Sequence, residues 1–432
     1  IDARRRGKLD FVYTVDIAVK DEAKILARKL PNVSITPDIE YKYPEMGTEV
    51  MKHRPVVVGF GPAGMFSALI LAEMGYCPIV LERGGAVEDR VRSISEFWSE
   101  GKLDPNSNVQ FGEGGAGTFS DGKLTTRVKD LRGRKVLEAL VEAGAPEDIL
   151  YMAHPHVGTD LLRNIVKNIR EKIISLGGEV RFNTQATGFI IDDGQITGVK
   201  IKGGEIIETE HVIVAIGHSA RDTFYELYES GVHFTAKPFA VGVRVEHPQS
   251  LIDVAQYKEF AGHEKLGAAE YRLTHTASNG RGVYTFCMCP GGLVVPSSSE
   301  KGRLVTNGMS EHARDQDNAN SALLVQVFPE DFGSDHPLAG VEFQRRLEEK
   351  AFGLGGSNYT APAQLVGDFL KGQASKKLGS VTPSYALGVK LTNLRRLLPD
   401  YITDAMADGL QAFDRKLKGF AMDDAVMTGV ES

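Results

Sequence analysis

The chain has 432 residues, of which 42% are hydrophobic and 25% are charged, and its formal net charge is −7. This composition is typical of a folded protein of two or three domains, and the acidic balance gives no electrostatic footprint for nucleic acid. No stretch of 18 apolar residues predicts a membrane span, and three cysteines cannot form a disulfide framework, so a cytoplasmic location is the simplest expectation.

Residues 1–48 predict a small α/β module that ends in a linker. Apolar side chains occupy every second position of residues 11–19, which is typical of a half-buried strand. Residues 20–30 place apolar side chains at helical spacing, and residues 35–50 contain the prolines and glycine of a linker. One strand and one helix cannot enclose a core, so we expect this module to be part of a larger unit.

Residues 56–64 (VVVGFGPAG) lead from an apolar run into a helical pattern through the spacing G-x-G-x-x-G. Gly59 permits a tight turn after a buried strand, Gly61 lets the backbone approach a pyrophosphate, and Gly64 lets the following helix pack on the sheet. An ordinary strand–turn–helix with convenient glycines is the alternative. The strand before the glycines and the helix after them favour a dinucleotide-binding turn.

The helix of this unit begins at Pro62 and Ala63, and its N-terminus offers free N–H groups and a partial positive charge to phosphates. A second apolar run, residues 78–81, ends on Glu82, which lies 18 residues after Gly64. A carboxylate there can accept hydrogen bonds from an adenosine ribose and disfavours a 2′-phosphate. The pattern therefore indicates FAD or NAD rather than NADP.

The remaining elements predict an α/β domain followed by a β-rich one. Helices are expected at 87–100, 132–144 and 159–176, and strands at 179–183, 186–191, 196–202 and 206–216. The last three strands are expected to form a β-meander, and residues 211–216 of the last strand are expected to be buried. Residues 238–395 predict short strands and loops with few long helices. The glycine-rich segment, residues 111–122, predicts a loop whose backbone lies against a flat ligand rather than a second fingerprint.

The single fingerprint, the β-meander and the strand ending at Gly217 resemble the glutathione-reductase-type FAD fold. More specifically, the chain resembles the bacterial family of uncharacterised FAD-dependent dehydrogenases, often labelled NAD(FAD)-utilising dehydrogenases. The motifs that carry this resemblance are FGEGGAGTFSDGKL at 111–124, HPHVGTD at 154–160, FCMCPGG at 286–292, TNGMS at 306–310 and GFAMDDAVMTGVES at 419–432.

The resemblance implies an α/β fold with three parts. A Rossmann-like FAD-binding domain with an inserted β-meander is expected over residues 49–235, after the N-terminal module. A β-rich mixed α/β substrate or cap domain is expected over residues 236–432. In related folds a late strand completes the FAD site, and that strand is expected beyond Ser432. With a first residue other than Met, the sequence is expected to be part of a longer polypeptide.

The resemblance also implies a set of cofactor-binding residues. Gly59, Gly61 and Gly64 would hold the FAD pyrophosphate, Glu82 the adenosine ribose, and Arg83 and Arg90 would lie near the adenosine and phosphates. The other implied residues are Gly114, Gly115, Ala116, Gly117 and Thr118 beside the flavin, Ala186 at the adenine, and Gly217 on the strand that returns to the cofactor.

The function implied is that of an FAD-dependent oxidoreductase that transfers a hydride through the flavin to or from an unidentified small molecule. No second fingerprint is visible, so NAD(P)H would bind only transiently as electron donor. A flavin-binding scaffold without turnover and a flavin-dependent RNA-modifying enzyme are the alternatives, and the acidic balance argues against the second. The oligomeric state is left open.

Four side chains are candidates for catalysis. In a regular strand Cys287 and Cys289 would point to one face, where they could act as a redox relay; two buried small side chains are the alternative, and one C-x-C does not predict a zinc site. His154 and His156 could share a face over the flavin or donate a proton, or simply be a polar helix entry. Arg244 and Glu246 alternate with valines, so both could point into a cavity, or they could simply be a cross-strand pair.

Overall fold

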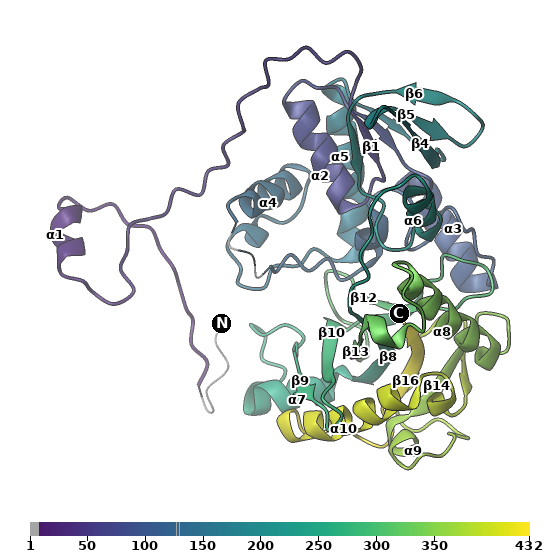
Figure 1. The fold of residues 1–432 in the computed structure, drawn as a ribbon. Coiled ribbons are helices and arrows are strands. Elements are labelled where there is room, and N and C mark those ends of the chain that lie inside the picture. Colours follow the sequence, from purple (N-terminus) through teal and green to yellow (C-terminus); the bar gives the residue numbers. More distant parts are fainter. Residues whose placement is uncertain (1–7, 127, 129) are drawn as a thin grey trace.

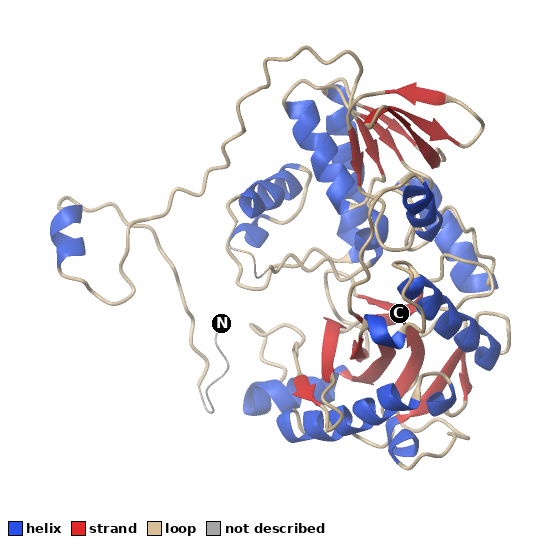
Figure 2. Ribbon diagram, viewed as in Figure 1, coloured by secondary structure: helices blue, strands red, loops and turns tan. Residues whose placement is uncertain are grey.

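The computed structural model describes residues 8–126, 128 and 130–432 of the chain. Most of these residues form two α/β bodies, one carrying β1–β7 with α2–α6 and the other carrying β8–β16 with α7–α10 (Figures 1 and 2). Both parallel and antiparallel sheets are present. No helix within the described residues is long and apolar enough to cross a bilayer.

Four short parallel strands, in the order β3-β2-β1-β7, form the main sheet of the first body. They are β1 (Val56–Val58), β2 (Ile79–Leu81), β3 (Glu179–Arg181) and β7 (Val212–Val214). Successive side chains of a strand point to opposite faces. Val57 therefore packs on the helical side, whereas Val56 and Val58 pack on the meander side. Because both faces are covered, the valine run can be apolar throughout.

Helices cover one face of this sheet. They are α2 (Pro62–Glu73), α3 (Val87–Glu100), α4 (Arg132–Glu142) and α5 (Thr159–Ser175), close to the predicted ranges. Ile165, Ile169 and Ile173 recur every four residues along α5 and are buried in the core shared with α2 and the sheet. Each fully buried side chain of this kind contributes roughly 1.5–3 kcal/mol.

The β-meander covers the other face as a separate three-stranded sheet. Its strands are β4 (Ala186–Asp192), β5 (Gln195–Ile201) and β6 (Ile206–Glu208). The prediction of one strand over 206–216 is wrong, because the buried Thr209 hydroxyl hydrogen-bonds the Arg54 carbonyl oxygen and the His211 amide and ends β6. The expected burial of 211–216 is also wrong: Ile213 and Val214 are 36% and 43% exposed at the sheet edge.

The second body contains one seven-stranded sheet in the order β15-β14-β16-β8-β13-β10-β9. β8 (Phe239–Pro248) pairs antiparallel with β13 (Asn318–Val327) along ten residues, so the expectation of only short strands after 238 is wrong. The other strands of this sheet are β9 (Thr274–Thr276), β10 (Gly282–Cys289), β14 (Ala361–Leu365), β15 (Val389–Leu391) and β16 (Val426–Glu431). A separate two-stranded sheet is formed by β11 (Leu293–Pro296) and β12 (Thr306–Met309). The helices are α7 (Gln249–Tyr257), α8 (Ala339–Gly355), α9 (Val366–Leu370) and α10 (Asp400–Lys416).

The N-terminal segment differs from its prediction. α1 (Glu22–Ala27) forms within the predicted helix but buries no side chain, and residues 11–19 form no strand. Phe11, Tyr13 and Ile17 are 57%, 78% and 74% exposed, because no neighbouring strand among the described residues pairs with this stretch. The segment extends away from both bodies (Figure 1). Residues 1–7 of the predicted module lie outside the described residues.

One buried arginine joins the two bodies. Arg221, the first residue of α6 (Arg221–Glu229), donates hydrogen bonds to both carboxylate oxygens of Glu348 on α8, at 2.6 and 2.8 Å, and to Glu300 at 2.8 Å. Burial alone would raise the pKa of Glu300, but hydrogen bonds from Arg345 and Arg221 outweigh burial and lower this pKa to about 2. The junction is therefore stable with Glu300 ionised.

Acid should weaken this junction. Because the folded-state pKa of Glu300 lies below its ordinary value of 4.5, its contribution to stability is complete above that pH and is lost as the pH falls toward 2. We expect the difference in unfolding free energy between the wild type and Glu300→Gln to shrink between about pH 6 and about pH 3 in urea titrations. An equal difference at both pH values would contradict this role.

Candidate functional site

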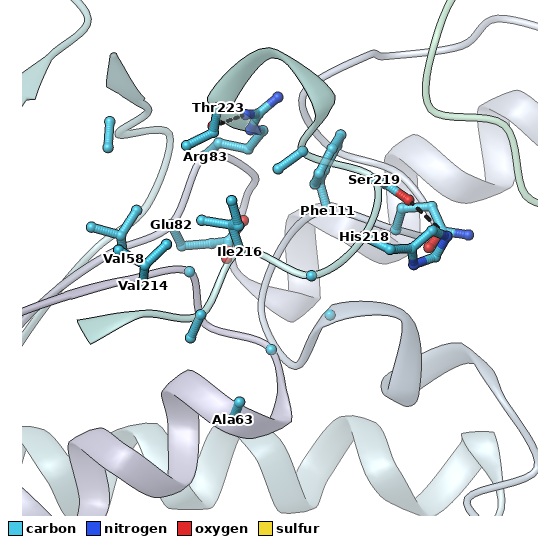
Figure 3. A pocket seen from close by; sticks show the side chains of 18 of the residues that line it. Val58, Ala63, Glu82, Arg83, Phe111, Val214, Ile216, His218, Ser219 and Thr223 are labelled. Carbon is cyan, nitrogen blue, oxygen red and sulfur yellow. Dashed lines mark hydrogen bonds between the residues drawn. The ribbon is translucent and has the colours of Figure 1, made fainter. Parts of the chain in front are cut away.

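A cavity of about 510 Å³ opens at the carboxyl ends of β1, β2 and β7 (Figure 3). Ligands of open α/β sheets bind at this edge of the strands. Most of the predicted cofactor-binding residues line the cavity: Gly59, Gly61, Pro62, Ala63, Glu82, Arg83, Gly115, Ala116, Gly117, Ala186 and Gly217. Val214 also lines it, which explains the exposure of this strand residue.

The three glycines of the β1–α2 turn differ in what a side chain at each position would contact. Gly59 has a φ of +98°, and a Cβ atom there would lie 2.4 Å from the Ala215 carbonyl oxygen. A Cβ on Gly64 would lie 1.9 Å from the Gly59 carbonyl oxygen, so this residue permits the helix to pack closely and does not line the cavity. A Cβ on Gly61 would meet only the Gly115 Cα, at 3.7 Å. The fold itself therefore requires glycine at positions 59 and 64 but leaves room for a side chain at position 61.

The N-terminus of α2 faces the same cavity. Gly61 is its N-cap residue and has no side chain to accept hydrogen bonds from the first-turn amides, and Pro62 and Ala63 begin the helix on the cavity wall. Unpaired N–H groups at a helix N-terminus, together with the helix dipole, attract anions such as phosphates. The turn can therefore bind a pyrophosphate through its backbone.

Glu82 follows β2 and is only 5% exposed. Its Oε2 accepts a hydrogen bond from the Phe60 amide at 2.8 Å, and its Oε1 accepts hydrogen bonds from the amides of Gly84 and Gly112, both at 2.9 Å. A carboxylate offers about four acceptor directions, so about one is left for a ligand. The carboxylate holds the cavity wall together and still faces the cavity.

The glycine-rich segment forms a 3-10 turn, η1 (Gly115–Phe119), beside the fingerprint. Its Gly115 packs so closely that a Cβ would lie 2.9 Å from the Gly61 Cα, and its φ is +58°. Gly114 and Thr118 do not line the cavity, contrary to the prediction. The Thr118 hydroxyl donates to the Glu113 carbonyl oxygen at 3.3 Å, which turns this side chain into the protein.

Arg83 lines the cavity, but its charge is already paired. Its Nη2 lies 2.7 Å from an Asp222 carboxylate oxygen at the start of α6, and its guanidinium lies 4.4 Å from the centre of the Phe111 ring. A stacked guanidinium presents a flat, weakly hydrated surface beside the ligand space. Arg83 therefore links the strand end to α6 and forms one wall of the cavity (Figure 3).

Arg90, which was predicted to lie near the adenosine and phosphates, does not line the cavity. Its side chain is fully buried on α3, and its guanidinium donates hydrogen bonds to the carbonyl oxygens of Asn108, Val109 and Glu113 at 2.6–2.8 Å. These carbonyls belong to the loop that enters the glycine-rich segment, and a buried carbonyl needs a donor. Arg90 acts on the cavity only indirectly, by holding this loop.

Sequence reasoning missed several lining residues. His218 and Ser219 follow Gly217, with the imidazole Nε2 3.3 Å from the Ser219 hydroxyl (Figure 3). Desolvation by the surrounding protein atoms lowers the pKa of His218, and the positive charge of the nearby Arg221 lowers it further. Thr184 and Gln185 also line the cavity. The rule that ligands bind where parallel strands end could have identified the residues after β7 and β3.

None of the four predicted catalytic side chains lines this cavity. The side chain of His154 is 75% exposed and lies 3.5 Å from Glu270, and the ring of His156 stacks on His312 with centroids 5.1 Å apart. Burial lowers the pKa of His156. The backbone bridge between His156 and Lys123 directs its ring to His312, so the two predicted histidines share no face.

The cysteines also depart from a regular strand. A β-bulge between Phe286 and Cys289, with a left-handed backbone at Cys287, breaks the alternation on which the shared face was predicted. Arg244 beside them is buried and hydrogen-bonds Asn320 and Cys289. It thus lies neither in the cavity nor in a pair with its strand neighbour Glu246, whose carboxylate binds Ser384 instead.

Residues 238–432 match the family model described as the FAD-dependent protein, C-terminal domain-like family. An uncharacterised protein of Clostridium beijerinckii is 53% identical over 434 residues, which cover 100% of this chain and 81% of that protein. The chain belongs to this family of FAD-dependent proteins.

Other similarities are more distant. A digeranylgeranylglycerophospholipid reductase of Methanocella arvoryzae is 29% identical over 166 residues, which cover 37% of this chain and 38% of the reductase. The crystal structure of the halogenase PltM is 11% identical, with a TM-score of 0.35 over 69% of this chain and 56% of the halogenase. Neither match extends over two thirds of the relative.

FAD is the cofactor of this family, and the cavity fits its chemistry. The free N-terminus of α2 can bind phosphates, the close approach of Gly61 and Gly115 leaves backbone rather than side chains at the surface, and exposed Val214 offers apolar contact. A dinucleotide needs all three kinds of surface.

Replacing Gly61 and Gly64 separately tests the division of roles between them. Gly61→Ala adds a methyl group at the cavity wall and should weaken FAD binding by about tenfold, or 1.4 kcal/mol, without lowering the stability of the FAD-free protein. Gly64→Ala overpacks the turn and should cost about 1–3 kcal/mol of stability. Fluorescence titration with FAD and thermal unfolding separate the two effects; a Gly61→Ala protein with unchanged affinity would contradict the assignment.

Removing the Arg90 guanidinium should destabilise the fold. Arg90→Met leaves three buried carbonyl oxygens without a donor and should cost about 3–5 kcal/mol in chemical unfolding. Arg92→Met is the matched control on the same helix, because the Arg92 side chain is 76% exposed and, among the described residues, pairs with Asp89 alone. Its effect should stay within about 0.5 kcal/mol. Equal losses in the two variants would show that the carbonyl contacts are unimportant.

Proposed function

We propose that this FAD-dependent protein is an oxidoreductase that transfers a hydride through the flavin to or from a small molecule. The proposal rests on one observation: a glycine turn, a free helix N-terminus and a buried carboxylate meet in a single cavity of a chain from an FAD-dependent family. These are the groups that a dinucleotide requires.

Within this proposal each wall of the cavity has a role. The amides at Gly61 and Ala63 bind the pyrophosphate, and the free acceptor direction of Glu82 binds the ribose. The backbone at Ala186 contacts the adenine, and the glycine-rich turn at Gly115 and the residues around it lie along the flavin. The support for these roles is the lining of the cavity and the orientation of α2.

The bound flavin supplies the hydride chemistry, and the protein supplies position and electrostatics. His218 and Ser219 place an imidazole and a hydroxyl on the cavity wall, where they can hydrogen-bond polar atoms of the cofactor or substrate. Because the pKa of His218 is lowered, its imidazole is neutral at neutral pH and can both accept and donate a hydrogen bond.

A nicotinamide donor, in this proposal, binds only transiently. Among the described residues, a single parallel sheet carries the nucleotide fingerprint, and the sheet of the second body is built around antiparallel pairs. A second dinucleotide therefore has no dedicated turn of the same kind within the described residues, and NADH or NADPH would approach the flavin directly.

Anaerobic titration tests the proposed function. The protein saturated with FAD is mixed with NADH or with NADPH, and the visible absorption of the oxidised flavin is followed. The expected result is bleaching by at least one donor and recovery on admission of an electron acceptor. Gly61→Ala at the same FAD concentration should show proportionally less bleaching, because less flavin is bound.

Two outcomes would overturn the proposal. A protein that does not take up FAD has no such function, and the cavity then serves another ligand. A protein that binds FAD whose flavin is reduced by neither NADH nor NADPH would instead be a flavin-binding scaffold.

A further inference from the structure

A second cluster of reactive side chains lies at the end of β10, outside the cavity. Cys289 is fully buried, whereas Cys287 is half-buried and follows Phe286, whose side chain is 61% exposed. Neither cysteine lines the proposed FAD site. Cys287 is therefore partly exposed, whereas Cys289 is enclosed by the protein.

The backbone places the Cys289 thiol beside Cys287. The β-bulge between Phe286 and Cys289 and the φ of +47° at Cys287 break the regular strand. As a result Cys289 Sγ lies 3.4 Å from the Cys287 carbonyl oxygen. A left-handed non-glycine residue costs about 1–3 kcal/mol, and such conformations cluster at functional sites.

Two cations stabilise a thiolate at this position. Arg244 Nη2 lies 2.9 Å from the Cys287 carbonyl oxygen and 3.6 Å from Cys289 Sγ, and Lys123 Nζ donates to the Met288 carbonyl oxygen. The hydrogen bond from the Cys289 thiol lowers the pKa of Cys287; burial opposes this, and the two cations add to it. The same hydrogen bond and burial raise the pKa of Cys289.

Two carboxyl groups complete the surroundings. Glu431 on β16 lies 3.3 Å from Arg244 Nη1, and Asp121 lies 3.2 Å from Lys123 Nζ. Burial raises the pKa of Glu431 to about 7, although Arg244 opposes the shift. Near neutral pH Glu431 is only partly ionised, so a thiolate at Cys287 takes part of the role of counter-ion to Arg244.

We propose that Cys287 and Cys289 form a thiol–disulfide exchange site for low-molecular-weight disulfides, with Cys287 as the attacking sulfur and Cys289 as the resolving sulfur. A partly exposed thiol near two cations and a buried thiol beside it are the two parts that such exchange needs. The site goes beyond the proposed hydride transfer and does not depend on it, because the exchange uses no flavin.

The exchange balances with the two thiols and a disulfide R–S–S–R alone. The Cys287 thiolate attacks one sulfur of the disulfide, forms a mixed disulfide and releases RS⁻. This RS⁻ takes the proton of Cys289, whose thiolate then attacks Cys287 Sγ and releases a second RS⁻. That anion takes a proton from water. The two cysteines are oxidised to one disulfide, and R–S–S–R is reduced to two thiols.

Mass spectrometry of the intact cysteine pair tests this proposal. The reduced, FAD-loaded protein is treated with oxidised glutathione and quenched with acid, and tryptic peptide 282–301, which contains both cysteines, is analysed. The expected result is loss of two hydrogens in this peptide, and a glutathione adduct at Cys287 in the Cys289→Ser variant. At about pH 6, Cys287 should react about tenfold faster than Cys77, a half-buried loop thiol whose Sγ lies beside the Gly75 and Leu176 carbonyl oxygens rather than beside Arg244 or Lys123.

Cys77→Ser is the matched control and should leave the reaction of the pair unchanged. Unfolding and FAD titrations of each variant show whether a loss of reactivity comes from the missing thiol or from a change in the fold. The central measurement uses the wild-type protein and therefore does not depend on how any variant folds. The proposal is overturned if peptide 282–301 of the wild type gains no disulfide, or if Cys287 reacts no faster than Cys77. Either result leaves the anaerobic flavin titration unaffected, so the two proposals can fail separately.

Discussion

The carboxylate of Glu82 ties together three backbone segments that surround the cavity. It accepts hydrogen bonds from the amides of Phe60 in the fingerprint turn, Gly84 after β2 and Gly112 in the glycine-rich segment. Hydrogen bonds to a charged group contribute about 1.5–3 kcal/mol each, so one buried side chain fixes the relative positions of these loops. The residue that the sequence pattern assigns to a ribose is therefore first a structural element of the wall, and its ligand role uses the acceptor direction that remains.

The second body supports the same wall from outside. Gln110 donates a hydrogen bond to the Ser297 hydroxyl at 2.6 Å, and Arg314 binds the buried Asp121 at the end of the glycine-rich segment. Together with the Arg221 junction, these contacts connect the ligand cavity to loops and helix α8 of the second body. The thiol pair at the end of β10 is also linked to the glycine-rich segment. Lys123, which directly follows that segment, donates a hydrogen bond to the carbonyl oxygen of Met288, the residue between the two cysteines.

Sequence reasoning was reliable where the signal is local. The glycine turn and the helices at 87–100 and 159–176 follow from spacing and periodicity, which depend only on neighbouring residues. It failed where a distant partner decides the outcome. Residues 11–19 have a strand pattern but no partner strand in the part of the chain that the structure describes. Arg90 turns to loop carbonyls, and the bulge at Cys287 lies where β10 pairs with β13. A sequence pattern states what a residue can do, and tertiary contacts decide which of its options is used.

The most direct test of the central claim is a structure of the protein determined with FAD bound. The account predicts the pyrophosphate at the N-terminus of α2, beside Gly61 and Ala63, with a ribose hydroxyl donating to Glu82. It also predicts the isoalloxazine along the turn that begins at Gly115. A flavin bound elsewhere, or a pyrophosphate that makes no contact with the α2 amides, would contradict the account.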